Sequence, residues 1–326
     1  RTGGKHDGTI ELEFPLHPLI YTLKLERGDM TLHDARGRVD LRLDSGDVHA
    51  NGGSGTLTVS NGRGDVSVET YSGDVTINSG SGDRVLNNVN GDLAVRAGKG
   101  DTKIERGRGN AIIANASGDL RISERDVPEL TVAQASGDVI IHGGRLGKTL
   151  IETASGDIIC ATALSIATYD LTASSGDMTL SVPRELPARV DAATTRGSID
   201  TDLPLVTIPQ RGPRNPHGKR VVGSTSDAPE RAEITLRTTS GDIRLQWSKE
   251  TFTPPESSAH PDLEPTIPIP MTAPKPPAEP VAEDLFDDDH RRAILNALAD
   301  GSLSVEEASR LLDAMSGSAE TTNGGR

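Results

Sequence analysis

Glycine recurs at a fixed interval of nine residues from residue 28 to residue 118, and this period constrains the fold more than any other feature. Only 35 of the 326 residues are glycine, so composition alone does not produce such a register. A strict period of this kind is typical of repeat architectures, in which each unit is one small supersecondary element. The periodic positions are Gly28, Gly37, Gly46, Gly55, Gly64, Gly73, Gly82, Gly91, Gly100, Gly109 and Gly118.

Each nine-residue unit combines a turn with a short amphipathic strand. In residues 64–72, glycine and aspartate begin the unit, and both favour a tight corner because glycine has a permissive backbone and aspartate bonds nearby amides. Val66 and Val68 follow, two residues apart, which predicts a strand with one face inside. The same spacing gives the pairs Leu57/Val59, Val75/Ile77, Leu93/Val95 and Leu120/Ile122.

A strand of this kind buries its apolar face only when a copy of the unit stacks on each side of it. Two units make a coil of two facing strands, and successive coils then lie about 4.8 Å apart. The predicted fold class is all-β: a single-stranded parallel β-solenoid, or β-helix, with two-strand coils of about 18–20 residues. After Gly118 the Gly-Asp pairs begin at residues 137, 156 and 176, so the coil lengthens while one corner keeps its sequence.

The ends of the repeat differ from its middle. Residues 1–27 are predicted to form an N-terminal cap, and residues 28–248 the solenoid repeat domain. Within the solenoid, the proline-rich stretch 203–232 interrupts the rhythm and is predicted to be an exposed loop. Apolar alternation returns in residues 233–247, which are predicted to rebuild a last coil.

The sequence after the solenoid changes character twice. Ten of the 20 prolines lie between Pro254 and Pro280, which indicates a disordered, extended linker over residues 249–285. Residues 286–316 have a helical period and predict a small α-helical hairpin, followed by a disordered tail at 317–326. A hairpin this small buries few side chains, so we expect a protein partner or self-association through its apolar residues Ile294, Leu295, Leu298, Leu311 and Leu312.

Composition excludes several classes of function. The formal net charge is −14, which argues against nucleic acid as a partner. No apolar run is long enough for a membrane span within residues 1–326, and the compartment, cytoplasm or cell envelope, stays open. The single cysteine, Cys160, lies at an inward strand position and is expected to be a buried small hydrophobe.

One corner of successive coils carries a row of aspartates, which is the main candidate site. We expect a structural role in which each carboxylate accepts amide hydrogens at its corner, because like charges at strand spacing otherwise repel. The alternative is a row of bound cations, as in the calcium β-roll, but that repeat has a residue between glycine and aspartate. The row contains Asp47, Asp65, Asp83, Asp101, Asp119, Asp138, Asp157 and Asp177. No catalytic residue, metal site or cofactor is expected.

Short motifs in the repeat resemble a known family. Ser-Gly-Asp-Val at 45–48, 72–75 and 136–139 and Ser-Gly-Asp-Ile at 155–158 are similar to the repeats of a bacterial adhesin-like family, a β-strand-repeat domain of unknown function. The resemblance spans roughly residues 10–248 and implies no established catalytic residues. The helical segment resembles the small SHOCT-like module, and some relatives imply a link to responses of the cell envelope to stress.

Together these observations predict a non-enzymatic structural or interaction protein, an adhesin-like scaffold linked to the bacterial cell envelope. One alternative is a carbohydrate-binding or carbohydrate-active β-helix that uses the aspartate-lined face. Sugar sites favour aromatic platforms, and in the repeat Tyr71 and Tyr169 are almost the only candidates. A second alternative is a calcium-binding protein similar to the β-roll, and a third is self-assembly through the solenoid ends.

Overall fold

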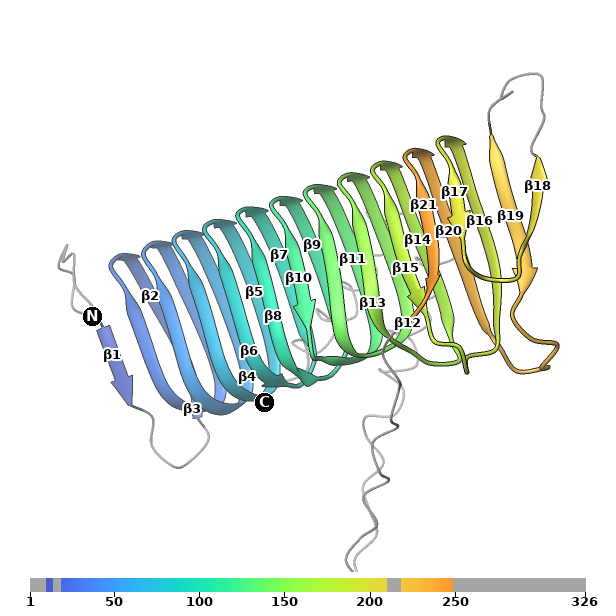
Figure 1. Ribbon diagram of the computed structural model, residues 1–326. Helices are drawn as coiled ribbons and strands as arrows, with labels where there is room; N and C mark the ends of the chain where they lie inside the picture. Colours follow the sequence, from blue (N-terminus) through green and yellow to red (C-terminus); the bar gives the residue numbers. More distant parts are fainter. Residues whose placement is uncertain (1–9, 14–18, 210–217, 249–326) are drawn as a thin grey trace, which may run out of the picture. The chain divides into compact units, whose positions relative to one another are not determined.

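The computed structural model of the protein describes residues 10–13, 19–209 and 218–248. Within them the backbone winds into a stack of about 9 turns, joined by hydrogen bonds into one 21-stranded sheet (Figure 1). The all-β parallel solenoid predicted from the glycine period is confirmed. The predicted linker (249–285), helical hairpin (286–316) and tail (317–326) lie outside the described residues and stay predictions.

The strands vary in length because some of them continue through a corner of the coil and others stop at it. They are β1 (Ile10–Glu13), β2 (Leu19–Arg27), β3 (Met30–Ser45), β4 (Val48–Arg63), β5 (Val66–Ser81), β6 (Arg84–Asn90), β7 (Leu93–Lys99), β8 (Thr102–Arg108), β9 (Ala111–Ser117), β10 (Leu120–Ser123), β11 (Asp126–Ser136), β12 (Val139–Ser155), β13 (Ile158–Leu164), β14 (Thr168–Ser175), β15 (Met178–Val182), β16 (Ala188–Arg196), β17 (Ile199–Thr201), β18 (Val206–Pro209), β19 (Lys219–Ser224), β20 (Ala232–Ser240) and β21 (Ile243–Trp247).

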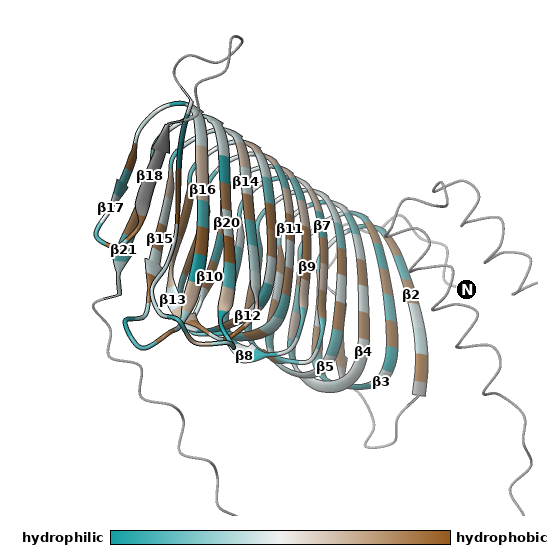
Figure 2. Ribbon diagram, turned by 90° about the vertical axis from the view of Figure 1, so that its right-hand side faces the viewer, coloured by the Kyte–Doolittle hydropathy of each residue, from teal (hydrophilic) through white to brown (hydrophobic). Residues whose placement is uncertain are grey.

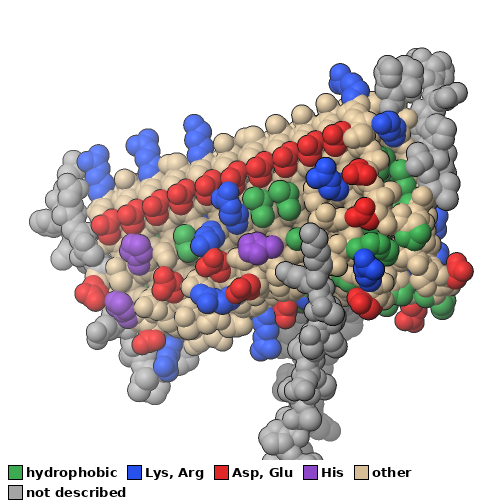
Figure 3. All heavy atoms as spheres, viewed as in Figure 1, with side chains coloured by type: hydrophobic (Ala, Val, Ile, Leu, Met, Phe, Trp, Pro, Cys, Tyr) green, Lys and Arg blue, Asp and Glu red, His purple; other side chains and the backbone are tan. Residues whose placement is uncertain are grey.

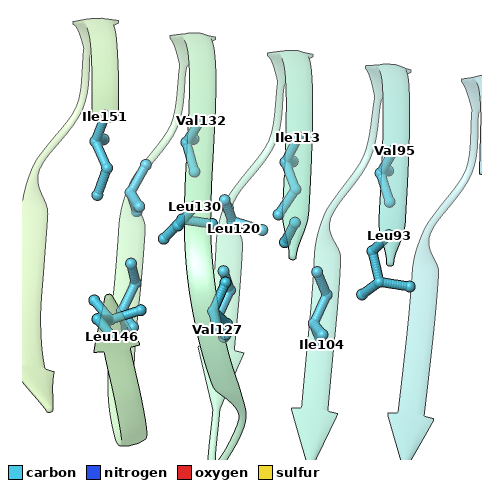
Figure 4. Packing of buried hydrophobic residues seen from close by; sticks show 14 of the residues in the cluster. Leu93, Val95, Ile104, Ile113, Leu120, Val127, Leu130, Val132, Leu146 and Ile151 are labelled. Carbon is cyan, nitrogen blue, oxygen red and sulfur yellow. The ribbon is translucent and has the colours of Figure 1, made fainter. Parts of the chain in front are cut away.

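Apolar side chains form columns inside the stack. Val59, Ile77, Val95 and Ile113 lie opposite one another in successive coils, and each is at most 1% exposed. Figure 4 shows neighbouring members of these columns pointing into the same narrow interior, and Figure 2 shows the alternation of polar and apolar residues along the strands. All five predicted inward pairs are buried. A thin core of aliphatic side chains therefore holds the coils together.

The Gly-Asp corner brings successive backbones unusually close. Gly100 has a φ of 107°, in the region that favours glycine, and a Cβ added there would lie 2.2 Å from the carbonyl oxygen of Gly82. The same approach recurs at Gly118, whose added Cβ would lie 2.2 Å from the oxygen of Gly100. A side chain at this position would push neighbouring coils apart, which explains why glycine recurs at this corner in successive coils.

The N-terminal segment joins the stack instead of forming a separate cap. β1 and β2 both pair parallel with β3, with Ile10 opposite Met30 and Leu23 opposite Leu41. The reason is that the alternating apolar residues Tyr21, Leu23 and Leu25 continue the inward columns and pack against the core. In the described residues, the predicted cap is thus a first coil in register.

The stretch 203–232, predicted to be a loop, contains two strands. β18 and β19 pair antiparallel with each other, and β19 pairs antiparallel with β16. Arg220 on β19 donates to both carboxylate oxygens of Asp191 on β16, at 2.7 and 2.5 Å, which lowers the pKa of that carboxyl. The hairpin therefore covers the edge of β16, a strand edge that would otherwise be free to pair with another chain.

The prediction that residues 233–247 form the last coil is wrong, because these strands do not lie at the end of the stack. β20 lies between β14 and β16, and β21 lies between β15 and β17 (Figure 1). The coil of β16 and β17 is thus the outer one, although it comes earlier in the chain. The intervening stretch that carries β18 and β19 gives the chain the length to return and fill the gap.

Replacing a corner glycine should destabilise the whole stack. Because Gly100→Ala combines a positive φ with a clash against backbone, we expect a loss of roughly 2–4 kcal/mol in the free energy of unfolding. Urea unfolding followed by circular dichroism measures it. Ser117→Ala, at an exposed position beside the next corner glycine, is the control and should stay within about 0.5 kcal/mol of the wild type.

The insertion of β21 can be tested with pairs of cysteines. Thr179 and Arg244 are opposite each other on β15 and β21, within the Cα separation that a disulfide spans. Asp200 on β17 lies opposite Arg244 on the far side. Oxidation should therefore crosslink Thr179→Cys with Arg244→Cys but leave Thr179→Cys with Asp200→Cys uncrosslinked. The reverse pattern, read by peptide mass spectrometry, would show that the coils stack in chain order.

Candidate functional site

The predicted aspartates form one continuous row along the Gly-Asp corner, visible as a red line in Figure 3. In each coil the Oδ1 atom of the aspartate accepts the backbone N–H of the aspartate one coil further on, as in the bond from Asp119 to Asp101 at 2.9 Å. The same bond, at 2.8–3.1 Å, connects Asp47, Asp65, Asp83, Asp101, Asp119, Asp138, Asp157 and Asp177 in order. Each of these bonds joins the aspartate corners of two neighbouring coils.

The row extends beyond the residues that the sequence analysis named. Asp29 accepts the N–H of Asp47 at one end, and at the other Asp177 accepts that of Asp242, which in turn accepts that of Ser198. The bond from Ser198 lowers the pKa of the Asp242 carboxyl. The row follows the spatial order of the coils, so it passes through the inserted coil before the outer one. The glycine in front of Asp242 and of Ser198 was the available signal.

A shorter row lies at the other corner of the coil. Asp74 accepts the N–H of Asp92 at 3.1 Å, and Asp92 accepts that of Asn110 at 2.9 Å. The described residues contain no group of three or more His, Cys, Asp or Glu side chains with the geometry to hold a metal ion. Each carboxylate in these rows accepts a backbone N–H from the neighbouring coil with one of its oxygens.

A buried arginine lies directly beneath the long row. Arg84 is 0% exposed and occupies an inward position that Val66 holds in one neighbouring coil and Thr102 in the other. Its guanidinium donates to the carbonyl oxygens of Lys99 and Gly100 and to the hydroxyl of Thr102. Burial lowers the pKa of Arg84. The negative charges of the row, chiefly that of Asp83, oppose this shift in part. A cation inside the stack thus offsets part of the repulsion along the row.

A second buried arginine lies in the coil where the repeat begins to lengthen. The Arg125 guanidinium donates to the carbonyl oxygens of Val89 at 2.5 Å and Gly91 at 2.9 Å, and burial lowers its pKa to about 10. Gly107 in the preceding coil leaves room for it, because a Cβ there would lie 2.9 Å from Nη1. Arg125 therefore fixes the backbone of the second corner from inside.

An open groove of about 810 Å³ runs along this second corner, and we call it the second-corner groove. It forms where the coil grows: Leu120 and Val139 are paired 19 residues apart, and the register shifts again between His142 and Arg145. Pro128 stands at the corner position that Gly147 occupies in the next coil. The added residues widen the corner and hollow its outer surface.

The second-corner groove has a positive lining with an apolar wall. Arg108, Asp126 and Arg145 lie opposite one another in three successive coils, and Lys148 lies close by in the chain. Lys148 forms an ion pair at 2.8 Å with Glu129. Ile166, on the same lining, is 53% exposed. The lining carries three cations and one carboxylate, and the adjacent Glu129 pairs with Lys148, so the local charge stays positive in a chain with a formal charge of −14.

A second hollow, of about 440 Å³, has the opposite character. Asp74, Asp92 and Glu129 line it, with no lysine or arginine among its lining residues. The Oδ1 atoms of Asp74 and Asp92 already accept backbone N–H groups in the short row. The two hollows share this stretch of the stack, so the surface changes sign over a short distance.

Other residues singled out from the sequence have structural roles. Cys160 is 2% exposed, and burial raises the pKa of its thiol to about 12, as expected for a small core residue. Tyr71 and Tyr169 are each 1% exposed, so neither ring can serve as a platform for a sugar. Tyr169 donates its hydroxyl hydrogen within the core, to the carbonyl oxygen of Leu146 or of Ser165. The apolar hairpin residues lie outside the described residues.

Fold and surface together define a β-solenoid repeat protein. A sequence profile described as Toastrack DUF4097 matches residues 56–246, more than half of the chain. The chain therefore belongs to the Toastrack DUF4097 family. No curated protein and no solved structure matches the chain significantly. The described residues contain no helix with the length and apolarity of a membrane span.

The aspartate row can be tested by separating its acceptor role from its charge. Asp101→Ala leaves the N–H of Asp119 without its acceptor and should cost about 1–2 kcal/mol in the free energy of unfolding. Asp101→Asn keeps an acceptor oxygen, removes one like charge and should stay near the wild type. Urea unfolding measures both. If calcium raised the stability of the wild type but not of Asp101→Asn, bound cations would explain the row instead.

Proposed function

We propose that this protein is a non-enzymatic interaction scaffold, in which the solenoid is a rigid frame that presents a binding surface to a protein partner. The second-corner groove is the observation that carries the proposal. It is the place where the repeat departs from its own period and where the surface charge departs from that of the chain. Departures of this kind in repeat proteins commonly lie on the binding face.

The stack supports this role because its frame is stiff. Parallel strands fix the backbone on both sides of the groove, and Arg125 ties the carbonyl groups beneath it. The carboxylates of the long aspartate row already accept backbone amides, and the tyrosines are buried in the core. A carbohydrate site on the aspartate-lined face has less support, since the aromatic candidates are buried.

A second contact is proposed for the C-terminal segment. The apolar stripe of residues 286–316, with Ile294, Leu295, Leu298, Leu311 and Leu312, provides a surface for a protein partner or for a second copy. A role at the bacterial cell envelope is part of the proposal and rests on the sequence resemblance alone. Replacing Leu298 and Leu311 by aspartate in the full chain tests this contact separately.

The scaffold function is tested by comparing partners of three full-length proteins. The wild type, a groove variant (Arg108→Glu with Lys148→Glu) and a control variant (Arg63→Glu with Arg96→Glu) are immobilised and exposed to extract. All four positions are exposed, and both pairs change the charge equally. We expect a purified partner to bind the wild type and the control in calorimetry and to lose at least tenfold in affinity for the groove variant. Equal binding to all three would remove the groove from the proposal.

A further inference from the structure

We propose that the second-corner groove binds an acidic peptide segment of a partner protein in an extended conformation. The inference rests on the proposed function and names the chemistry of the partner. Its basis is a combination of three features on one surface: two arginines on either side of Asp126, an exposed apolar side chain beside them, and a groove that runs across several coils.

The spacing of the cations suits an extended chain. Arg108 and Arg145 are two coils apart with Asp126 between them, which places their backbones about 9.6 Å apart at normal strand separation. A polyproline II segment returns to the same face every three residues, after about 9.3 Å. Two acidic side chains three residues apart could therefore face the two guanidinium groups at once.

The charge balance favours carboxylates over other partners. Arginine forms strong, charge-assisted hydrogen bonds with carboxylates, and clusters of arginine are a recurring device for recognising acidic motifs. Asp126 lies between the two arginines in register and limits how tightly a single anion would be held. Several carboxylates spread along the groove would gain more than one small anion, because each meets a different cation.

The apolar wall adds selectivity. Ile166 is 53% exposed and Pro128 is exposed beside the basic residues, so part of the lining gains from contact with an apolar side chain. An acidic peptide with an intervening leucine or phenylalanine offers both kinds of contact. An anionic oligosaccharide offers carboxylates without such a side chain, so the geometry points to the peptide.

The probe is a fluorescein-labelled peptide with the sequence Glu-Asp-Leu-Phe-Asp-Asp-Asp, which is also the sequence of residues 283–289. Fluorescence anisotropy against the full chain at low salt should give saturable binding. A matched peptide with Gln and Asn in place of Glu and Asp, and a peptide with Ala in place of Leu and Phe, should each bind at least tenfold more weakly. Affinity should also fall as sodium chloride rises, because the contacts are ionic.

Variants locate the binding site. Arg108→Glu with Lys148→Glu, and Ile166→Ser alone, should weaken probe binding at least tenfold and fivefold, while Arg63→Glu with Arg96→Glu should leave it within twofold. Circular dichroism melting confirms that each variant is folded. If both groove variants bound the probe with the affinity of the wild type, the peptide would bind elsewhere and the proposal would be overturned.

Two further experiments identify which kind of molecule binds in the groove. Oligogalacturonate that bound to the groove while the peptide did not would give the surface to carbohydrate and overturn the peptide assignment. Replacing Asp287, Asp288 and Asp289 by Asn in the full chain should leave probe affinity unchanged. A tenfold rise would make this chain's own segment the occupant instead of a partner protein. A purified partner that needs the groove, found in the absence of any peptide binding, would retain the scaffold function and reject only the acidic-peptide chemistry.

Discussion

The distance between backbones at the Gly-Asp corner is the constraint on which the rest of this structure depends. Only glycine lets one coil lie directly on the carbonyl group of the next, and the aspartate that follows then has the neighbouring amide within reach. Every coil repeats this contact, so the apolar columns inside and the rows of polar side chains outside are brought into line. The register of the whole stack is thus set at its tightest point.

Alignment has an electrostatic consequence, because like residues in successive coils become neighbours. The repulsion between stacked carboxylates is offset in part because each of them accepts an amide hydrogen, and buried Arg84 supplies a cation from the inside. Removing a carboxylate and removing a buried guanidinium are therefore not independent changes. Where the repeat lengthens, Arg125 is the buried cation at the second corner and binds the carbonyl oxygens of Val89 and Gly91. The outer surface of this corner differs from the repeat sequence.

Much of this fold was predictable from local pattern. Glycine spacing and the alternation of residues such as Val66 and Val68 define the coil, and the Gly-Asp pair predicts the amide bonds of the row. The order of the final coils was not predictable, because Gly197 and Gly241 begin equally acceptable corners and only the fit of side chains across strands decides between them. Arg84 and Arg125 left a weaker signal, since Thr102 and Gly107 accommodate them from the adjacent coil, 18 residues away from each arginine. The only sequence signal of the groove was the longer spacing after Gly118, because its residues are chemically ordinary until the widened corner brings them together.

The inserted position of β21 has a mechanical consequence. A strand at the end of a stack can be peeled from its single neighbour one hydrogen bond at a time. β21 is held on both sides, by β15 and by β17, so a pull applied after Trp247 loads two ladders of bonds in shear together. Any tether that follows this strand is consequently attached to a strand with a paired neighbour on each side.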